Sequence, residues 1–222
     1  MPDAETAPWA QTYTGRAVDL LLPKVEQIHL DDICVALERL PRFNGHTTHP
    51  WSVAAHSLCV ADALELTGAL PEPAERLAAL LHDAHEAYTG DIISPMQAAI
   101  DRTEIRAIQA GLQQAIHQRF GLPASLPHNT IVAIKQADLA MLAREKDSLM
   151  AAPPRPWIDL PPPAAVNVFA PGWMAPGTWR QRFIDLMCAW HGLRVVPASE
   201  APPPRPRAKP RPFTDPFTDD DE

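Results

Sequence analysis

Four side chains that commonly bind metal ions stand at positions where a helical core would carry apolar groups. His56 lies in an apolar run, His82 and Asp83 are adjacent near the end of an apolar segment, and Asp138 interrupts an apolar stripe. Burying a carboxylate is costly unless a cation or hydrogen-bond donors compensate it. A divalent ion does this well, and imidazole with carboxylate suits Zn, Mn, Fe or Co. Together the four residues predict a metal site.

Each of these residues has an ordinary structural explanation when it is taken alone. A single buried histidine is more often a hydrogen-bonded core residue than a ligand. A single aspartate on an apolar stripe often caps a helix or joins an ion pair. All four together are harder to explain in this way, and this favours the metal site.

Helical segments are expected to carry all four residues. Apolar residues at helical spacing, with capping residues and glycine or proline at the ends, predict these helices. Their ranges are 31–40, 51–67, 73–88, 101–120, 129–150 and 178–191. The stripe of the helix over 129–150 passes through Ile131, Ile134 and Met141. An extended piece is expected over 17–22. No segment shows a convincing alternation of apolar and polar residues with the period of two that is typical of a strand. The predicted fold class is an all-α bundle.

The prolines suggest how the chain is divided. There are 26 prolines against 9 glycines, and many of them lie within 153–176 or after residue 197. We expect an N-terminal arm over 1–15, one domain over 16–196, and a disordered tail over 197–222. The tail is proline-rich and basic, then acidic, and cannot bury enough apolar area to fold.

Composition limits the classes of function. The 222 residues are enough for one substantial domain, and a net charge of −8 disfavours nucleic acid as a partner. No apolar run approaches the roughly 20 residues of a membrane span, and the N-terminus lacks signal-peptide features. Three cysteines without paired spacing favour reduced thiols and a cytoplasmic protein.

The order of His56, His82-Asp83 and Asp138 resembles the H…HD…D pattern of the HD-domain superfamily of metal-dependent phosphohydrolases. The flanking runs are similar to the 5′-deoxynucleotidase-like branch, which also includes phage-type deoxynucleoside triphosphohydrolases. Those runs are Arg42–Thr47, Ser52–Ser57, His82–Ile92 and Ser94-Pro95. The resemblance covers about residues 15 to 150, and it implies an HD-domain helical bundle.

The resemblance also implies roles for individual residues. One divalent ion would be held, with its identity open among Co, Mn, Zn, Fe and Mg. Its ligands would be His56, His82, Asp83 and Asp138. Glu86, at i+4 from His82 and therefore on the same helical face, resembles the family's catalytic carboxylate. Asp91, in the Thr-Gly-Asp turn, resembles the second acidic residue used near the leaving group.

Substrate contacts are expected on the flanking runs. Arg42 is the first candidate for a phosphate or sugar contact, because guanidinium matches phosphate bidentately. It can equally serve as a basic residue at a helix C-terminus. His46 and Lys135 are weaker phosphate candidates. Phe43 and Trp51 can supply a stacking wall or simply pack in the core.

The function that this resemblance implies is removal of phosphate from (deoxy)nucleoside 5′-monophosphates. Two alternatives stay open: a triphosphohydrolase that releases tripolyphosphate from a dNTP, and a non-catalytic nucleotide-binding regulatory module. The expected partner is a small-molecule nucleotide, with no nucleic acid and no membrane. Self-association into a homo-oligomer is expected because relatives assemble as dimers or larger rings.

Overall fold

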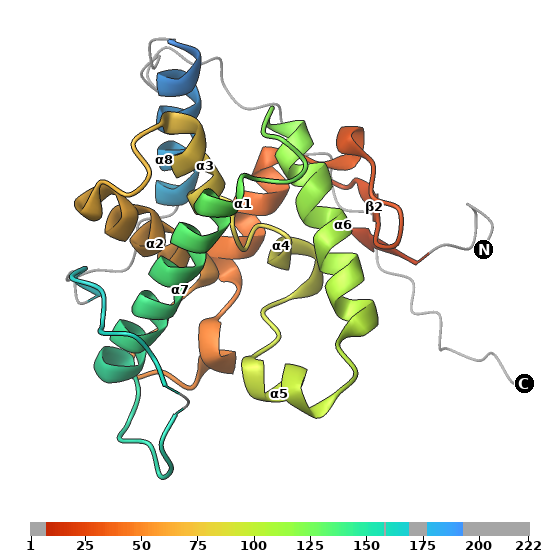
Figure 1. Cartoon of the computed structure of the whole chain (residues 1–222). Coiled ribbons are helices and arrows are strands. Elements are labelled where there is room, and N and C mark those ends of the chain that lie inside the picture. The colour runs from red at the N-terminus through yellow and green to blue at the C-terminus, as the bar shows by residue number, and fades with distance from the viewer. Residues whose placement is uncertain (1–7, 158, 169–176, 193–222) are drawn as a thin grey trace, which may run out of the picture.

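The computed structural model describes residues 8–157, 159–168 and 177–192, and the fold is all-α, as the sequence predicts (Figure 1). Among these residues the strands form one short antiparallel pair, with Trp9 opposite Asp19. In chain order the elements are β1 (Trp9–Gln11), β2 (Ala17–Asp19), η1 (Val25–Gln27), α1 (Leu30–Arg39), η2 (Arg42–Gly45), α2 (Val53–Thr67), α3 (Pro73–Leu80), α4 (Glu86–Thr89), α5 (Ser94–Ala99), α6 (Thr103–Arg119), α7 (His128–Leu149) and α8 (Thr178–His191). No helix of the described residues has the length and apolarity that crossing a membrane requires.

Helix α2 lies at the centre of the bundle. It packs against α1, α3, α7 and α8, and α3 also packs against α8 (Figure 1). The Ser52 hydroxyl caps its start by accepting a hydrogen bond from the Ala55 N–H at 3.2 Å, and Gly68 ends it in the left-handed conformation. Residues 53–57 are all buried, so the first turn is enclosed on every side. His56 is therefore fixed in the interior.

Helix α7 turns one face toward α2. Apart from Ala143, its buried residues recur every three or four positions: Thr130, Ile134, Ala137, Met141, Glu145 and Leu149. Ile131, which the sequence placed on this stripe, is 46% exposed. The buried stripe begins at Thr130, one residue before Ile131, and it includes the polar residues Thr130 and Glu145. A prediction based on apolar residues alone therefore misplaced it. Asp138 stands beside this face.

The predicted helix over 73–88 is interrupted. Helix α3 ends at Leu80, and α4 begins at Glu86. Between them the backbone forms tighter i→i−3 hydrogen bonds, including Ala84 N–H to the Leu81 carbonyl at 2.9 Å. His82 and Asp83 therefore lie on turns, and the prediction that Glu86 shares a helical face with His82 is wrong.

Within the predicted N-terminal arm, residues 9–11 form strand β1, which the sequence did not predict. Thr14 joins this hairpin to α1, since its N–H and hydroxyl donate to the Asp32 carboxylate at 2.7 and 3.0 Å. Asp32 is buried, so these bonds replace the water that its carboxylate loses. The predicted tail over 197–222 lies outside the described residues.

Candidate metal centre

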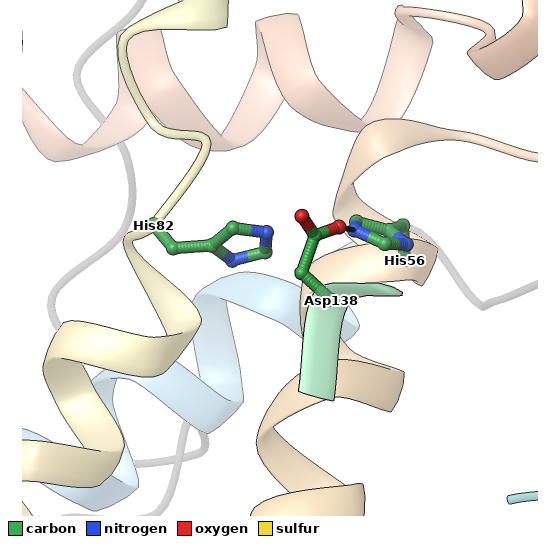
Figure 2. Close-up of side chains that lie close together, drawn as sticks. All are labelled: His56, His82 and Asp138. Atoms are coloured by element: carbon green, nitrogen blue, oxygen red, sulfur yellow. Dashed lines mark hydrogen bonds and ion pairs between the residues drawn. The ribbon is translucent and has the colours of Figure 1, made fainter. Parts of the chain in front are cut away.

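Three side chains from three separate elements meet between α2, α7 and the turns after α3. His56 comes from α2, His82 from the turns after α3, and Asp138 from α7 (Figure 2). One ligand atom of each lies within 4.8 Å of the others, and Figure 2 shows the Asp138 carboxylate between the two imidazole rings. The Asp138 Oδ1 atom lies 3.1 Å from His56 Nε2. Two nitrogens and one oxygen at this separation can hold a divalent ion.

Asp83, the fourth predicted ligand, lies against both imidazoles. Its Oδ2 atom is 3.1 Å from His82 Nε2 and 3.7 Å from His56 Nε2. The structure thus brings together all four residues that the sequence singled out, with Asp83 at the side of the three-residue cluster. Burial opposes ionisation of Asp83, yet the two histidines hold its pKa below the usual range.

The ring orientation of His82 suits a ligand. Its Nδ1 atom lies 2.9 Å from the Ala79 carbonyl oxygen, which can only accept, so the ring proton is on Nδ1. In the neutral ring Nε2 is then the unprotonated nitrogen, and it faces the cluster. Within the described residues, this buried atom has no partner in hydrogen-bond geometry. A metal ion would satisfy it.

Glu145 is a buried carboxylate that the sequence reasoning missed. It is fully buried, and three donors reach it from distant parts of the chain. The Trp51 indole N–H donates to Oε1 at 2.7 Å, His56 Nδ1 lies 2.8 Å from the same oxygen, and Arg42 Nε donates to Oε2 at 3.1 Å. A carboxylate that fixes one ring nitrogen of a histidine directs the other nitrogen toward the metal.

A signal for Glu145 was present in the sequence. It follows Asp138 by seven residues, which is close to two helical turns, so both project from neighbouring positions of one face. Burial opposes ionisation of Glu145, but His56 and Arg42 hold its pKa below the ordinary value. Burial and Arg42 oppose protonation of His56, whereas Glu145 and Asp138 raise its pKa to about 9.

A turn with unusual backbone geometry holds Arg42 in the interior. Phe43 and Asn44 adopt left-handed conformations (φ 54° and 51°), which cost energy for residues other than glycine. Arg42 is buried, its NH1 atom lies 3.8 Å from Asp83 Oδ2, and its guanidinium covers the Phe43 ring with 5.3 Å to the centroid. The terminal nitrogens of Arg42 therefore lie near the cluster while Glu145 holds Nε.

Two further carboxyl groups, Glu86 and Asp91, lie within the electrostatic range of the cluster. Burial, then repulsion from Asp83 and Asp91, raises the pKa of Glu86 to about 10. Burial and Asp83 also raise the pKa of Asp91, while Arg42 opposes this. Among the described residues, Glu86 Oε2 is buried without a hydrogen-bond partner. This region carries more negative charge than its own cations neutralise.

Of the remaining predicted contacts, Trp51, Phe43 and Lys135 touch residues of this centre. Trp51 anchors Glu145 through its indole, and Phe43 packs against Trp157 with ring centroids 6.4 Å apart. Lys135 is 65% exposed, and its ammonium donates to Asp138 Oδ2 at 2.7 Å. His46 is exposed at the end of the turn that carries Arg42. Trp157, in the proline-rich segment to which the sequence assigned no role, is brought to this turn.

Comparison with known proteins gives two clear relatives. An uncharacterized protein of Rhodobacter capsulatus is 40% identical over 143 residues, which cover 64% of this chain and 72% of the relative. The uncharacterized protein YfdR of Escherichia coli K12 is 32% identical over 181 residues, which cover 79% of this chain and 94% of YfdR. The chain belongs to the YfdR family. No known protein-family profile matches the chain.

The YfdR family carries no activity in the names of these two members, so function has to be argued from the site. The match extends over nearly the whole of YfdR. It is much longer than segment 197–222 of this chain, so it cannot be confined to that segment. The match therefore includes much of the helical domain, which holds the candidate metal centre.

Proposed function

We propose that this chain is a metal-dependent phosphohydrolase that removes phosphate from (deoxy)nucleoside 5′-monophosphates. The observation that carries the proposal is the cluster of His56, His82 and Asp138, whose ligand atoms lie within 4.8 Å of one another. The proposal also rests on the resemblance of the sequence motifs to the 5′-deoxynucleotidase-like branch of the HD-domain superfamily.

The residues fit a divalent ion in both charge and donor type. Nitrogen and carboxylate oxygen suit Mn, Fe, Co and Zn. The surrounding carboxyl groups are Asp83, Glu86, Asp91, Asp138 and Glu145. The cations that face them are Arg42, Lys135 and the His56 ring, whose pKa is raised to about 9. An added double positive charge would reduce this imbalance, and it would satisfy His82 Nε2. The ion would supply Lewis-acid polarisation of a phosphoryl oxygen and would ease ionisation of water.

Glu86 and Asp91 are the proposed acid–base residues. In the hydrolysis, the oxygen of water forms a bond to phosphorus and the bond from phosphorus to the 5′-oxygen breaks. Glu86 takes the proton from the water, and Asp91 gives a proton to the departing alkoxide, which leaves as the nucleoside. The raised pKa of Asp91 suits a proton donor. Burial and repulsion raise the pKa of Glu86 to about 10, and a nearby cation would counter the repulsion and favour the ionised form that accepts a proton.

Arg42 is the proposed phosphate-binding residue. Glu145 holds its Nε atom at 3.1 Å, so the terminal nitrogens remain for phosphate oxygens beside the metal ligands. Phe43 and Trp157 would form the wall next to the sugar or base, because Phe43 lies directly under the Arg42 guanidinium. Lys135, at the exposed edge of Asp138, would add positive charge for an entering substrate.

The test is a hydrolysis assay with protein that has been stripped of metal and then loaded separately with Mn, Co, Mg or Zn. Substrates are dNMPs, NMPs and dNTPs, with products resolved by chromatography. Glu86→Ala and Asp138→Ala should abolish turnover. Asp147→Ala is the matched control, because Asp147 lies on α7 with its side chain 50% exposed.

Metal-dependent release of nucleoside from dNMPs, lost in both site variants and kept in the control, is the expected result. Release of tripolyphosphate from dNTPs alone would replace the proposed substrate with a triphosphate. Tight nucleotide binding without turnover under any metal would overturn the enzymatic proposal in favour of a regulatory nucleotide-binding module.

A further inference from the structure

The side chain of Gln113 on α6 takes the place of a backbone hydrogen bond in the segment that carries His82 and Asp83. In an uninterrupted α-helix the His85 N–H would donate to the Leu81 carbonyl. Here the His85 N–H donates to Gln113 Oε1 at 3.3 Å, and the Leu81 carbonyl accepts from Gln113 Nε2 at 2.8 Å. A side chain inserted between such groups is a known cause of helix interruption.

The Gln113 amide is held in this orientation by two further contacts. His85 Nδ1 lies 3.2 Å from Oε1, and His117 Nε2 lies 2.8 Å from the amide nitrogen. Because the amide nitrogen can only donate, His117 Nε2 must accept, which requires the neutral ring. His117 is buried, and this burial lowers its pKa and keeps the ring neutral. The amide therefore has partners on both its oxygen and its nitrogen.

The interruption also determines how His82 is presented. In a continuous helix the Ala79 carbonyl would accept a hydrogen bond from the Asp83 N–H. Because α3 ends at Leu80, this carbonyl instead pairs with His82, at 3.3 Å from its N–H and 2.9 Å from its Nδ1. The ring proton is thereby fixed on Nδ1, and Nε2 is left for the metal centre.

We infer that Gln113 is a positioning residue: its amide keeps residues 81–85 out of the helix and so brings His82 Nε2 and the Asp83 carboxylate to the metal ligands. The inference rests on the proposed metal-dependent function. It assigns to α6, which contributes no ligand to the cluster among the described residues, the task of shaping the segment that does.

The test compares Gln113→Met with Gln114→Met in the full-length protein. Methionine keeps the length of glutamine and removes both hydrogen-bonding groups. Gln114 is the next residue on α6 and is exposed, so it controls for the substitution itself. Affinity for Co²⁺ is measured from its visible absorption. The ring tautomer of His82 is read from long-range ¹H–¹⁵N correlations in metal-free protein at alkaline pH.

Gln113→Met is expected to weaken Co²⁺ binding by roughly 10- to 100-fold, and to shift the His82 ring proton away from Nδ1. Gln114→Met should match the wild type in both measurements. Unchanged Co²⁺ affinity and tautomer in Gln113→Met would overturn the inference. If that variant does not fold, Gln113→Glu keeps the acceptor for His85 and loses the donor to Leu81, and it should still weaken Co²⁺ binding.

The wild-type protein supplies a separate check. A His82 ring proton found on Nε2 in the wild type would overturn the inference whatever the variants do. Wild-type protein that binds Co²⁺ at this centre but hydrolyses no nucleotide would overturn the proposed function and leave the role of Gln113 standing.

Discussion

The aromatic cluster where the end of α6 meets α8 and the charged cluster between α2 and α7 are both largely buried, but different forces hold them. Near α8, Trp179 stacks on Phe183 with centroids 5.9 Å apart, and Phe120 meets Phe183 edge-on at 4.7 Å. That region gains free energy simply by excluding water. In the α2–α7 region several charged groups lose their hydration on folding. Hydrogen bonds and ion pairs with partners such as Glu145 compensate this loss of free energy.

The aromatic region thus stabilises the fold, whereas the charged region lowers its stability. Aromatic packing is the sum of many individually weak contacts, so a small shift loses only part of its energy. The charged region requires defined distances, and it holds carboxyl groups that repel one another, such as Asp83 and Glu86. Variants of the aromatic region should therefore mainly lower the free energy of unfolding. Variants of the charged region should mainly weaken metal binding.

The largest expected loss of stability is in the aromatic region. Trp179→Ala removes a fully buried ring and should lower the free energy of unfolding by about 3–5 kcal/mol, measured by urea denaturation. Co²⁺ affinity of the folded fraction should stay within about twofold of wild type. Trp9→Ala, at a ring that is 56% exposed, is the control and should cost below about 1 kcal/mol. A strong loss of Co²⁺ affinity in Trp179→Ala would mean that the regions are not separable.

Glu145→Gln should affect both properties. Removing one charge from a buried set of partners costs roughly 3 kcal/mol of unfolding free energy. Because the pKa of Glu145 is lowered in the fold from 4.5, its stabilisation is present above that pH and is lost on further acidification. The variant should therefore show a weaker acid dependence of stability, and Co²⁺ binding reduced about 10-fold. Asp147→Asn on the same helix should match wild type; equal acid dependence in both variants would contradict this account.

Glu86→Gln should raise stability while it removes activity. The pKa of Glu86 rises from 4.5 to about 10 on folding, so between these values the folded protein binds the proton more tightly than the unfolded chain. Stability therefore falls as pH rises through this range, and the amide removes that loss. Thermal and urea unfolding of metal-free protein at neutral pH should show a gain of about 1 kcal/mol. Glu104→Gln, on the exposed first turn of α6, is the matched control; a loss of stability in Glu86→Gln would refute the repulsion.

The smallest effect is expected at Lys135. Its ammonium pairs with Asp138 at 2.7 Å but is 65% exposed, so solvent screens the pair. Lys135→Met should change the free energy of unfolding by less than about 0.5 kcal/mol. Under the proposed function, KM for a nucleotide should rise more than kcat falls, and added salt should diminish the difference. A collapse of kcat would place Lys135 in the chemical step.

Much of the helical framework could be predicted because its signals are local. Ser52 before α2, Gly68 after it, and apolar residues at helical spacing all act within a few residues of the element. The four ligand candidates could be found because charged groups in apolar stripes are conspicuous. The predicted stripe through Ile131 was wrong because apolar character was followed, whereas the buried face of α7 includes Thr130 and Glu145.

Other features could not be predicted because their causes lie far along the chain. The interruption after Leu80 depends on Gln113, whose amide contacts a backbone 28 to 32 residues away. Strand β1 forms because β2 pairs with it and because Thr14 meets Asp32. Trp157 contacts Phe43 although more than a hundred residues separate them in the sequence, and no local sequence pattern predicts that contact.

The partners of Glu145 have a consequence for the order in which parts of the chain can fold during synthesis. Glu145 meets His56 across 89 positions and Arg42 across 103 positions of the chain. Contacts between such distant residues form only after most of the intervening chain has collapsed. During synthesis, the segment that carries Arg42 and His56 leaves the ribosome long before its carboxylate partner. A nascent chain that ends before α7 therefore lacks Asp138 and Glu145, so the candidate metal centre is complete only after α7 has joined the fold.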